Sequence, residues 1–355
     1  MNDDATAPAA PGATTLARLP SHRALRRGSA VAVAIGAIVA LGLGVATVDA
    51  RTLAAASGAP RAIATSLAIV LAAWLAEAVV FGALTGRLAP RDLRRMARIY
   101  LAGSFPSAVT PFASGSIPTW TWLLTREGLA PGEAAAVVGL HGVVTSAFFG
   151  IAALVAAIVL PGVLGPRWTG AVLGLVAVLL LSVALLAFVA LMPGAAAAAV
   201  RRIARVGAGK REERLGERIS AEVSASAATL RHAVRRRPLG LLLALAATCV
   251  SRALLFSVPF VLLRGFGLRV PWLPVVLGML AVQVVGSATP SPGGAGVSEA
   301  ALAGLLHAQA PAYLVGATVV LWRLLTFWLE MSASAFIFSR AIGARKKLAP
   351  REVSE

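Results

Sequence analysis

The chain has 355 residues, of which 58% are hydrophobic and only 14% are charged. A soluble domain carries about a quarter charged residues, so this composition excludes an ordinary soluble protein and predicts an all-α polytopic membrane protein. The net charge of +18 does not indicate a nucleic-acid partner here. The basic residues gather in loops between apolar runs, where membrane orientation and anionic lipid explain them better.

Six apolar runs are long enough to cross a bilayer, which takes about 20 helical residues. Residues 1–28 precede them, are rich in Ala, Pro and Arg, and are predicted to be disordered. A basic segment at 193–238 is predicted to be a cytoplasmic linker with an amphipathic surface helix, and a basic tail follows at 340–355. The six predicted spans are 29–48, 64–86, 134–160, 168–192, 239–263 and 312–339.

Two further apolar runs, 101–124 and 272–307, are interrupted by prolines and glycines. Basic residues cluster before the first span, after the second, in the linker and in the tail, so the positive-inside rule constrains these runs. If all four clusters are cytoplasmic, an even number of crossings separates each from the next. We therefore predict six crossings with cytoplasmic termini, and two re-entrant hairpins: 101–124 enters from the cytoplasm and 272–307 from outside.

The two interrupted runs share a sequence repeat. The hexapeptide TPFASG at 110–115 returns as TPSPGG at 289–294, and an Ala-Pro pair follows each hairpin. Each hexapeptide has the same place in a unit of span, hairpin and span, and the two hairpins enter from opposite faces. The predicted fold is therefore an inverted-topology repeat with halves at 29–192 and 239–339. Broken helices in such folds form a substrate site near the membrane midplane.

Three motifs resemble the signature of a membrane-protein family. They are PGGAGVSE at 292–299, REGLAPGEA at 126–134 and WRLLTFW at 322–328. Together they are similar to the flippase-like transmembrane family, whose best-known member is the membrane half of lysylphosphatidylglycerol synthase. The resemblance covers roughly residues 60–340. It implies a lipid flippase fold with re-entrant hairpins and membrane lipids as ligands.

Two departures limit what this resemblance implies. Family members usually carry a polar or charged residue just after the glycine of the first hairpin, followed by an arginine, whereas this chain reads GSIPTW from Gly115 onward. The headgroup preference of that half is therefore not carried over. The chain also ends at Glu355 without an acyltransferase domain, so synthesis of an aminoacylated lipid is not expected.

Ionisable residues inside apolar runs are the strongest site candidates, because each costs about 2.5–3.5 kcal/mol or more at the membrane centre. Two interpretations stay open. In one, the charges form structural ion pairs, such as Arg323 with Glu299, that hold the hairpins in place. In the other, they line a cavity in which arginines bind a lipid phosphate while a glutamate pairs with them or takes a proton. The structural interpretation is favoured for Glu77; the candidate site residues are Arg252, Arg323, Glu299 and Glu330.

The glycine-rich turn of the second hairpin is a candidate anion site. Gly293, Gly294 and Gly296 precede a predicted helix that begins at Val297, and a helix start offers free backbone N–H groups and the positive end of the dipole. The alternative is that the glycines only allow tight packing, and the two interpretations are compatible. The predicted substrate-binding set is completed by Thr110, Gly115 and Thr289.

Other residues of the apolar runs are expected to be structural. His141 has no acid or second histidine at ligand spacing on its own run, so a packed or hydrogen-bonded role is expected. Tryptophans near predicted span boundaries are expected to lie at the membrane interface; they are Trp120, Trp122, Trp168 and Trp272.

No Walker A sequence, metal-ligand cluster or nucleophile–base pair is visible, and the single cysteine, Cys249, excludes an intrachain disulfide. No cofactor, metal or enzymatic activity is therefore expected. We expect a flippase that moves a lipid with an anionic or zwitterionic headgroup, or a lipid-linked envelope precursor, between leaflets of the plasma (inner) membrane. An ion gradient, the membrane potential or the lipid gradient would drive it. The alternative is a non-transporting membrane subunit that presents lipid intermediates to an envelope biosynthetic enzyme.

Overall fold

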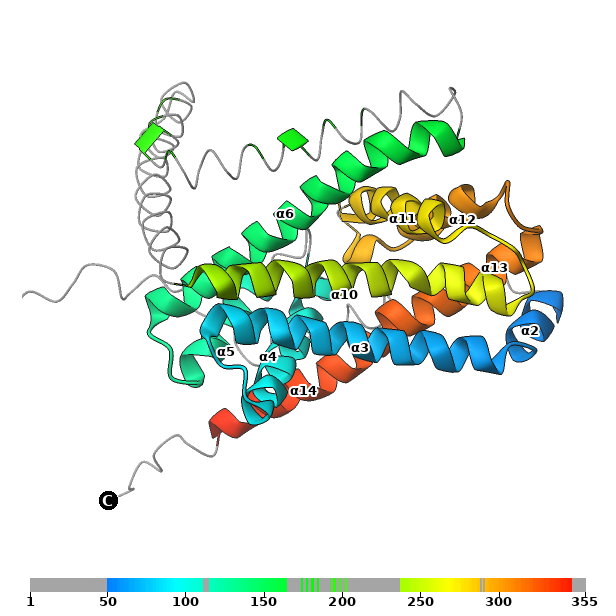
Figure 1. Cartoon of the computed structure of the whole chain (residues 1–355). Coiled ribbons are helices and arrows are strands. Elements are labelled where there is room, and N and C mark those ends of the chain that lie inside the picture. Colours follow the sequence, from blue (N-terminus) through cyan, green and yellow to red (C-terminus); the bar gives the residue numbers. More distant parts are fainter. Residues whose placement is uncertain are drawn as a thin grey trace, which may run out of the picture.

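A computed structural model describes residues 50–110, 115–164, 237–287, 289 and 291–346, with isolated positions between 174 and 202. In these parts of the chain every regular element is a helix (Figure 1). The predicted spans at 29–48 and 168–192 lie outside the described residues, apart from isolated positions of the second. The N-terminal segment, nearly all of the linker and the end of the tail also lie outside them.

Four of the six predicted spans are helices long and apolar enough to cross a membrane. The 26 residues of the first of them rise about 39 Å at 1.5 Å per residue, which exceeds the ~30 Å hydrocarbon core. Three begin with a proline, whose fixed φ and missing N–H suit the first helical turn. The chain is therefore a multi-pass membrane protein; the four are α3 (Pro60–Thr85), α6 (Pro131–Leu164), α10 (Pro238–Gly265) and the last span (Ala312–Ile342).

The last span is not a uniform α-helix. It consists of α13 (Ala312–Arg323), a π-helical turn η3 (Leu324–Trp328) and α14 (Leu329–Lys346). The π turn begins directly after Arg323 and ends just before Glu330. Such turns shift the register of a helix and occur frequently at functional sites. A short helix before α3, α2 (Ala50–Ser57), packs against α13.

Helices α3 and α10 run side by side along most of their length (Figure 1). Small residues allow this close approach: a Cβ at Gly240 would stand 2.8 Å from the carbonyl oxygen of Ala83, and one at Gly265 would overlap the Ala62 side chain. Membrane helices associate through such small residues because lipid provides no hydrophobic force between them. The two helices are therefore closely packed within the described bundle.

The first interrupted run forms two helices, α4 (Pro90–Val109) and α5 (Ser116–Arg126), which pack against each other. Helix α4 begins at Pro90, earlier than the predicted hairpin at 101–124, so the arginines from Arg91 to Arg98 lie on its first turns and not in a loop. Proline at the first position and Asp92 in the first turn favour this start. The helix ends at a break where Thr110 Oγ1 donates to the carbonyl of Pro106 at 2.7 Å.

The second interrupted run also breaks into two helices. Helix α11 (Trp272–Ser287) is followed by the short turn η2 (Pro292–Gly294) and by α12 (Val297–Leu306), close to the predicted start and end. Thr289 Oγ1 donates to the carbonyl of Val285 at 2.7 Å. Each repeated threonine therefore bonds to the carbonyl four residues before it, a contact that Thr318 and Thr326 also make within the last span.

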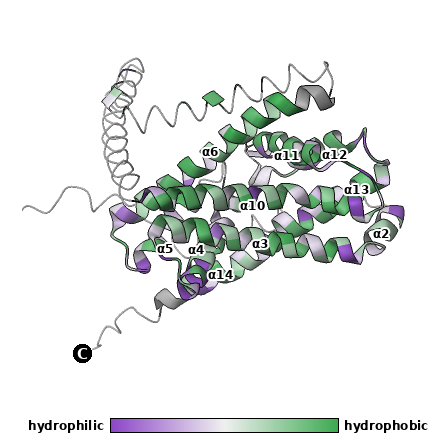
Figure 2. Cartoon of the chain, in the orientation of Figure 1, coloured by the Kyte–Doolittle hydropathy of each residue, from purple (hydrophilic) through white to green (hydrophobic). Residues whose placement is uncertain are grey.

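Large apolar side chains cover the outer surface of the bundle. Figure 2 shows hydrophobic residues along the length of α3, α6 and α10, with hydrophilic residues concentrated toward the helix ends. An exposed apolar surface of this extent needs an apolar environment, which acyl chains supply. The exposed residues on these helices include Leu67, Leu71 and Leu75, Ile151, Leu154 and Ile158, and Leu239, Leu242 and Val250.

Candidate functional site

A cavity of about 350 Å³ lies among the broken helices, α10 and the last span. The first helix pair contributes Ser104, Ser107 and Thr110 to its wall, and the second pair contributes Gln283 and Thr289. Its volume falls within the ~300–1,000 Å³ range of sites for small molecules. Charged residues of two spans complete the wall: Arg252 of α10, and Arg323 and Glu330 of the last span.

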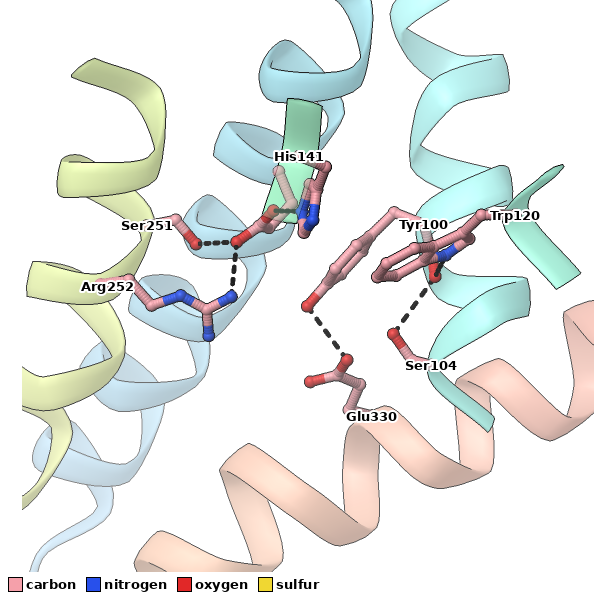
Figure 3. A network of polar contacts seen from close by, with 8 residues as sticks. Tyr100, Ser104, Trp120, His141, Ser251, Arg252 and Glu330 are labelled. Atoms are coloured by element: carbon pink, nitrogen blue, oxygen red, sulfur yellow. Dashed lines mark hydrogen bonds and ion pairs between the residues drawn. The ribbon is translucent and has the colours of Figure 1, made fainter. Parts of the chain in front are cut away.

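Beside the cavity, a polar cluster surrounds Glu77 in α3. The Glu77 side chain is 1% exposed and accepts hydrogen bonds from Ser251 Oγ at 3.0 Å and from Arg252 Nη2 at 3.2 Å. His141 Nε2 of α6 lies 3.3 Å from the other carboxylate oxygen (Figure 3). A buried carboxylate is tolerated only where charge and hydrogen bonds compensate its desolvation. Three helices meet at Glu77 to provide this compensation.

Aromatic rings enclose His141. It stacks on Phe81 with ring centroids 5.1 Å apart and meets the edge of Trp120 at 5.0 Å. Trp120 is 9% exposed and its Nε1 donates to the carbonyl of Tyr100 at 3.2 Å. The expectation that Trp120 anchors the membrane interface is therefore wrong. Its indole fills the space left by the missing side chain of Gly103, where a Cβ would overlap it.

A second ion pair joins the last span to α12. Arg323 Nε donates to Glu299 Oε1 at 2.7 Å, and its Nη2 donates to the carbonyl of Gly293 at 2.6 Å. The guanidinium also lies over the ring of Phe327, 4.2 Å from the centroid. Glu299 Oε2 accepts the N–H of Gly296 at 2.8 Å, which caps the start of α12. The pair thus fixes the glycine turn to the last span.

The three glycines of this turn have positive φ, between 60° and 86°, which favours glycine over other residues. Added Cβ atoms would overlap Phe327 at Gly293 and stand 2.8 Å from the carbonyl oxygen of Gly286 at Gly294. Gly293 presents its carbonyl, not its N–H, to Arg323, and the N–H of Gly296 is already bonded to Glu299. These contacts favour the packing interpretation of the glycines.

Glu330 differs from the two acids already described. Its Oε1 accepts a hydrogen bond from Tyr100 Oη of α4 at 3.1 Å (Figure 3). Among the described residues, no arginine, lysine or histidine nitrogen lies within ion-pair distance of Glu330. The carboxyl group nevertheless faces the cavity that Arg252 also lines.

The structure brings most of the predicted site residues to the cavity. Glu299, Gly296 and Gly115 do not line the cavity; Glu299 bonds to Arg323, Gly296 to Glu299 and Gly115 to Thr110. The other seven line it: Thr110, Arg252, Thr289, Gly293, Gly294, Arg323 and Glu330. Gly115 donates its N–H to Thr110 Oγ1 at 2.8 Å. Sequence reasoning missed Tyr100, although a tyrosine inside an apolar helix requires a hydrogen-bond partner. It also gave His141 no acid partner, because Glu77 lies on another helix.

Metal chemistry has no support in the described part of the chain, where no group of three or more His, Cys, Asp or Glu side chains could hold an ion. Together, the apolar bundle and its charged cavity define a polytopic membrane protein with a pocket that the broken helices line together with α6, α10 and the last span.

Comparison with known families agrees with this class. Residues 28–333 match the family described as the lysylphosphatidylglycerol synthase TM region. Because the match covers most of the chain, the protein belongs to this family, and the family resemblance predicted from the three motifs is confirmed. No curated protein matches the chain.

Proposed function

We propose that this protein moves an amphiphilic lipid between the leaflets of the plasma membrane, with the headgroup passing through the cavity and the acyl chains remaining in the bilayer. The observation that carries the proposal is the 350 Å³ cavity lined by Arg252, Arg323 and Glu330 inside an apolar bundle. Ionisable residues at membrane depth mark substrate or ion pathways by default. The family name, which refers to the synthesis of a phospholipid, supports a lipid as the substrate.

The charges favour a headgroup that contains a phosphate. Two guanidinium groups line the cavity, and arginine binds phosphate oxygens through paired, charge-assisted hydrogen bonds. The acid partners of these arginines, Glu77 and Glu299, approach them from behind the cavity wall. A headgroup can therefore reach the arginines without displacing the acids. Under this proposal, the protein is a transporter and not an enzyme.

Under this proposal, the two broken helix pairs are re-entrant hairpins that belong to an inverted repeat. The chain crosses the membrane six times, and both termini are cytoplasmic. Support comes from both helix pairs contributing to one cavity. Opposed hairpins that meet at a shared site are the arrangement used by transporters with alternating access.

Cysteine labelling tests this topology. In a Cys249→Ser background, Ser104→Cys should react with a membrane-impermeant maleimide from the cytoplasmic side, because α4 then opens to the cytoplasm. Gln309→Cys, at the end of the second pair, should react from the outside. Access to both positions from the same side would overturn the opposed arrangement.

Lipid movement itself is tested in proteoliposomes that carry fluorescent phospholipids. The variant Arg323→Gln/Glu299→Gln replaces the ion pair with neutral side chains that still form hydrogen bonds, so it is expected to fold. A hydrogen bond to a charged group is worth about 1.5–3 kcal/mol, so we expect a rate about 10- to 100-fold below wild type.

Arg264→Ala, which removes an exposed arginine at the end of α10, is the matched control and should leave the rate unchanged. Equal rates in the double variant and the wild type would remove the charged pair from the mechanism. A folded wild type that moves no lipid of any headgroup class would reject transport. It would favour a subunit that presents lipid intermediates to an envelope biosynthetic enzyme.

A further inference from the structure

Three acids surround the cavity: Glu77 and Glu299 are buried, whereas Glu330 is half-buried and lines the cavity. Only Glu77 and Glu299 have a cationic partner among the described residues. Glu77 pairs with Arg252 at 3.2 Å and Glu299 pairs with Arg323 at 2.7 Å. Glu330 has only hydroxyl partners among the described residues: Tyr100, at 3.1 Å, and Ser104. An isolated carboxylate in a low-dielectric environment neutralises itself by binding a proton when no cation is at hand.

The groups that face Glu330 come from every neighbouring helix. They are Tyr100 and Ser104 of α4, Arg252 of α10 and His141 of α6, all of which line the cavity. Glu77 bonds to Arg252 and His141 from outside the cavity lining, and Arg323 on the same span as Glu330 is paired with Glu299. Of the guanidinium and carboxyl groups, this cluster holds one guanidinium, that of Arg252, against two carboxyl groups, Glu77 and Glu330. One added proton makes it electrically neutral, and charge balance at this depth matters because each uncompensated charge is costly.

Arg252 has unused hydrogen-bonding capacity. Its Nε is buried and has no hydrogen-bond partner among the described residues, although Nη2 is bonded to Glu77. Figure 3 shows Arg252 and Glu330 on either side of the same space, next to the Tyr100 hydroxyl. Arg252 is therefore placed between two acceptors: Glu77, which it already contacts, and Glu330, once that group is ionised.

We propose that Glu330 is a binding site for one proton and that this proton is the coupling ion for lipid movement; the second part rests on the proposed function. When Glu330 carries the proton, Arg252 is free to bind the phosphate of a lipid headgroup. When Glu330 releases the proton to water in the cavity, its carboxylate attracts Arg252 and competes with the phosphate. Proton and phosphate therefore bind together, and a proton gradient drives the headgroup in the same direction.

Proton uptake on lipid binding tests the site directly in purified, detergent-solubilised full-length protein. Short-chain phosphatidylglycerol is added in weakly buffered solution with a pH indicator. At a pH above that at which the carboxylic-acid infrared band of the lipid-free protein disappears, wild type should take up about one proton per bound lipid. Glu330→Gln keeps an acceptor for Tyr100 and should bind the lipid without uptake. Glu133→Gln, an exposed acid at the start of α6, is the matched control and should behave as wild type.

Infrared spectroscopy provides a readout that does not depend on lipid. The carbonyl band of a protonated carboxylic acid should be present in wild type and in Glu133→Gln, and absent in Glu330→Gln. Persistence of this band in Glu330→Gln, or equal uptake in Glu330→Gln and wild type, would overturn the proposal. Loss of uptake in His141→Gln but not in Glu330→Gln would place the proton on His141 and would overturn it as well.

Proteoliposomes separate the failure of coupling from the failure of transport. A wild type whose lipid movement is unchanged by a pH gradient or a protonophore would refute coupling while leaving the proposed function intact. A Glu330 carboxylic-acid band in a protein that moves no lipid would support the proton site and reject the proposed function. Acceleration by an inward proton gradient, absent in Glu330→Gln, supports both.

Discussion

Arg252→Ala is expected to destabilise the protein by about 3–5 kcal/mol, the usual cost of removing one partner from a buried ion pair. Glu77 would keep Ser251 and His141 as neighbours but would lose its only arginine partner among the described residues. Its side chain is 1% exposed, so water cannot replace the lost charge. The free energy of unfolding is measured by denaturing-detergent titration in mixed micelles.

A second substitution separates the fold from the function. Glu77→Gln in the Arg252→Met background removes the stranded charge and keeps a hydrogen-bond acceptor for Ser251, so most of the stability should return. Replacing a buried ion pair with uncharged groups is often neutral for stability. Lipid movement should not return, because the guanidinium that binds phosphate is still absent. A double variant as unstable as Arg252→Ala would show that the pair does not account for the loss.

The spans were predictable because hydropathy is a local property of the sequence. Uninterrupted apolar runs predicted α3, α6, α10 and the last span, and clustered prolines and glycines predicted the two breaks. The start of α4 was missed because its first turns carry arginines, which were interpreted as a loop. Pro90 and Asp92 were the available signal, since both favour a helix start.

The partners within the site depend on tertiary packing, which a single sequence does not encode locally. The pairing of Arg323 with Glu299 was anticipated as an example of an ion pair between opposite charges inside apolar runs. Glu77 and Arg252 are 175 residues apart, and Tyr100 and Glu330 are 230 apart. No periodicity or spacing rule connects such positions. The requirement that each buried charge find a compensating group predicts that partners exist but not which residues they are.

The π turn of the last span lies between two residues that contact the two broken helix pairs. It separates Arg323, which is bonded to Glu299, from Glu330, which is bonded to Tyr100. Both residues line the cavity, as expected for positions seven apart, which lie on nearly the same face of a helix. The last span therefore contacts both broken helix pairs, α12 through Arg323 and α4 through Glu330.

Arg323→Ala is expected to release the glycine turn of the second helix pair and to cost about 3–5 kcal/mol of stability. Arg323 holds this turn through the carbonyl of Gly293 and through Glu299, whose side chain is 7% exposed and would be left without its cation. The glycines of the turn have positive φ. Because glycine adopts many backbone conformations with similar ease, the turn has little preference for its present conformation once the contacts with Arg323 are lost.

Cysteine reactivity reports this release. In a Cys249→Ser background, Ser291→Cys beside the turn should react with a maleimide several-fold faster when Arg323 is alanine. Ser107→Cys, on the α4 wall of the same cavity, should react at an unchanged rate. The neutral pair Arg323→Gln/Glu299→Gln should restore both the stability and the slow labelling, because two amides can bridge the same gap. Equal acceleration at both cysteines would instead indicate general unfolding, and no acceleration at Ser291→Cys would show that Arg323 does not hold the turn.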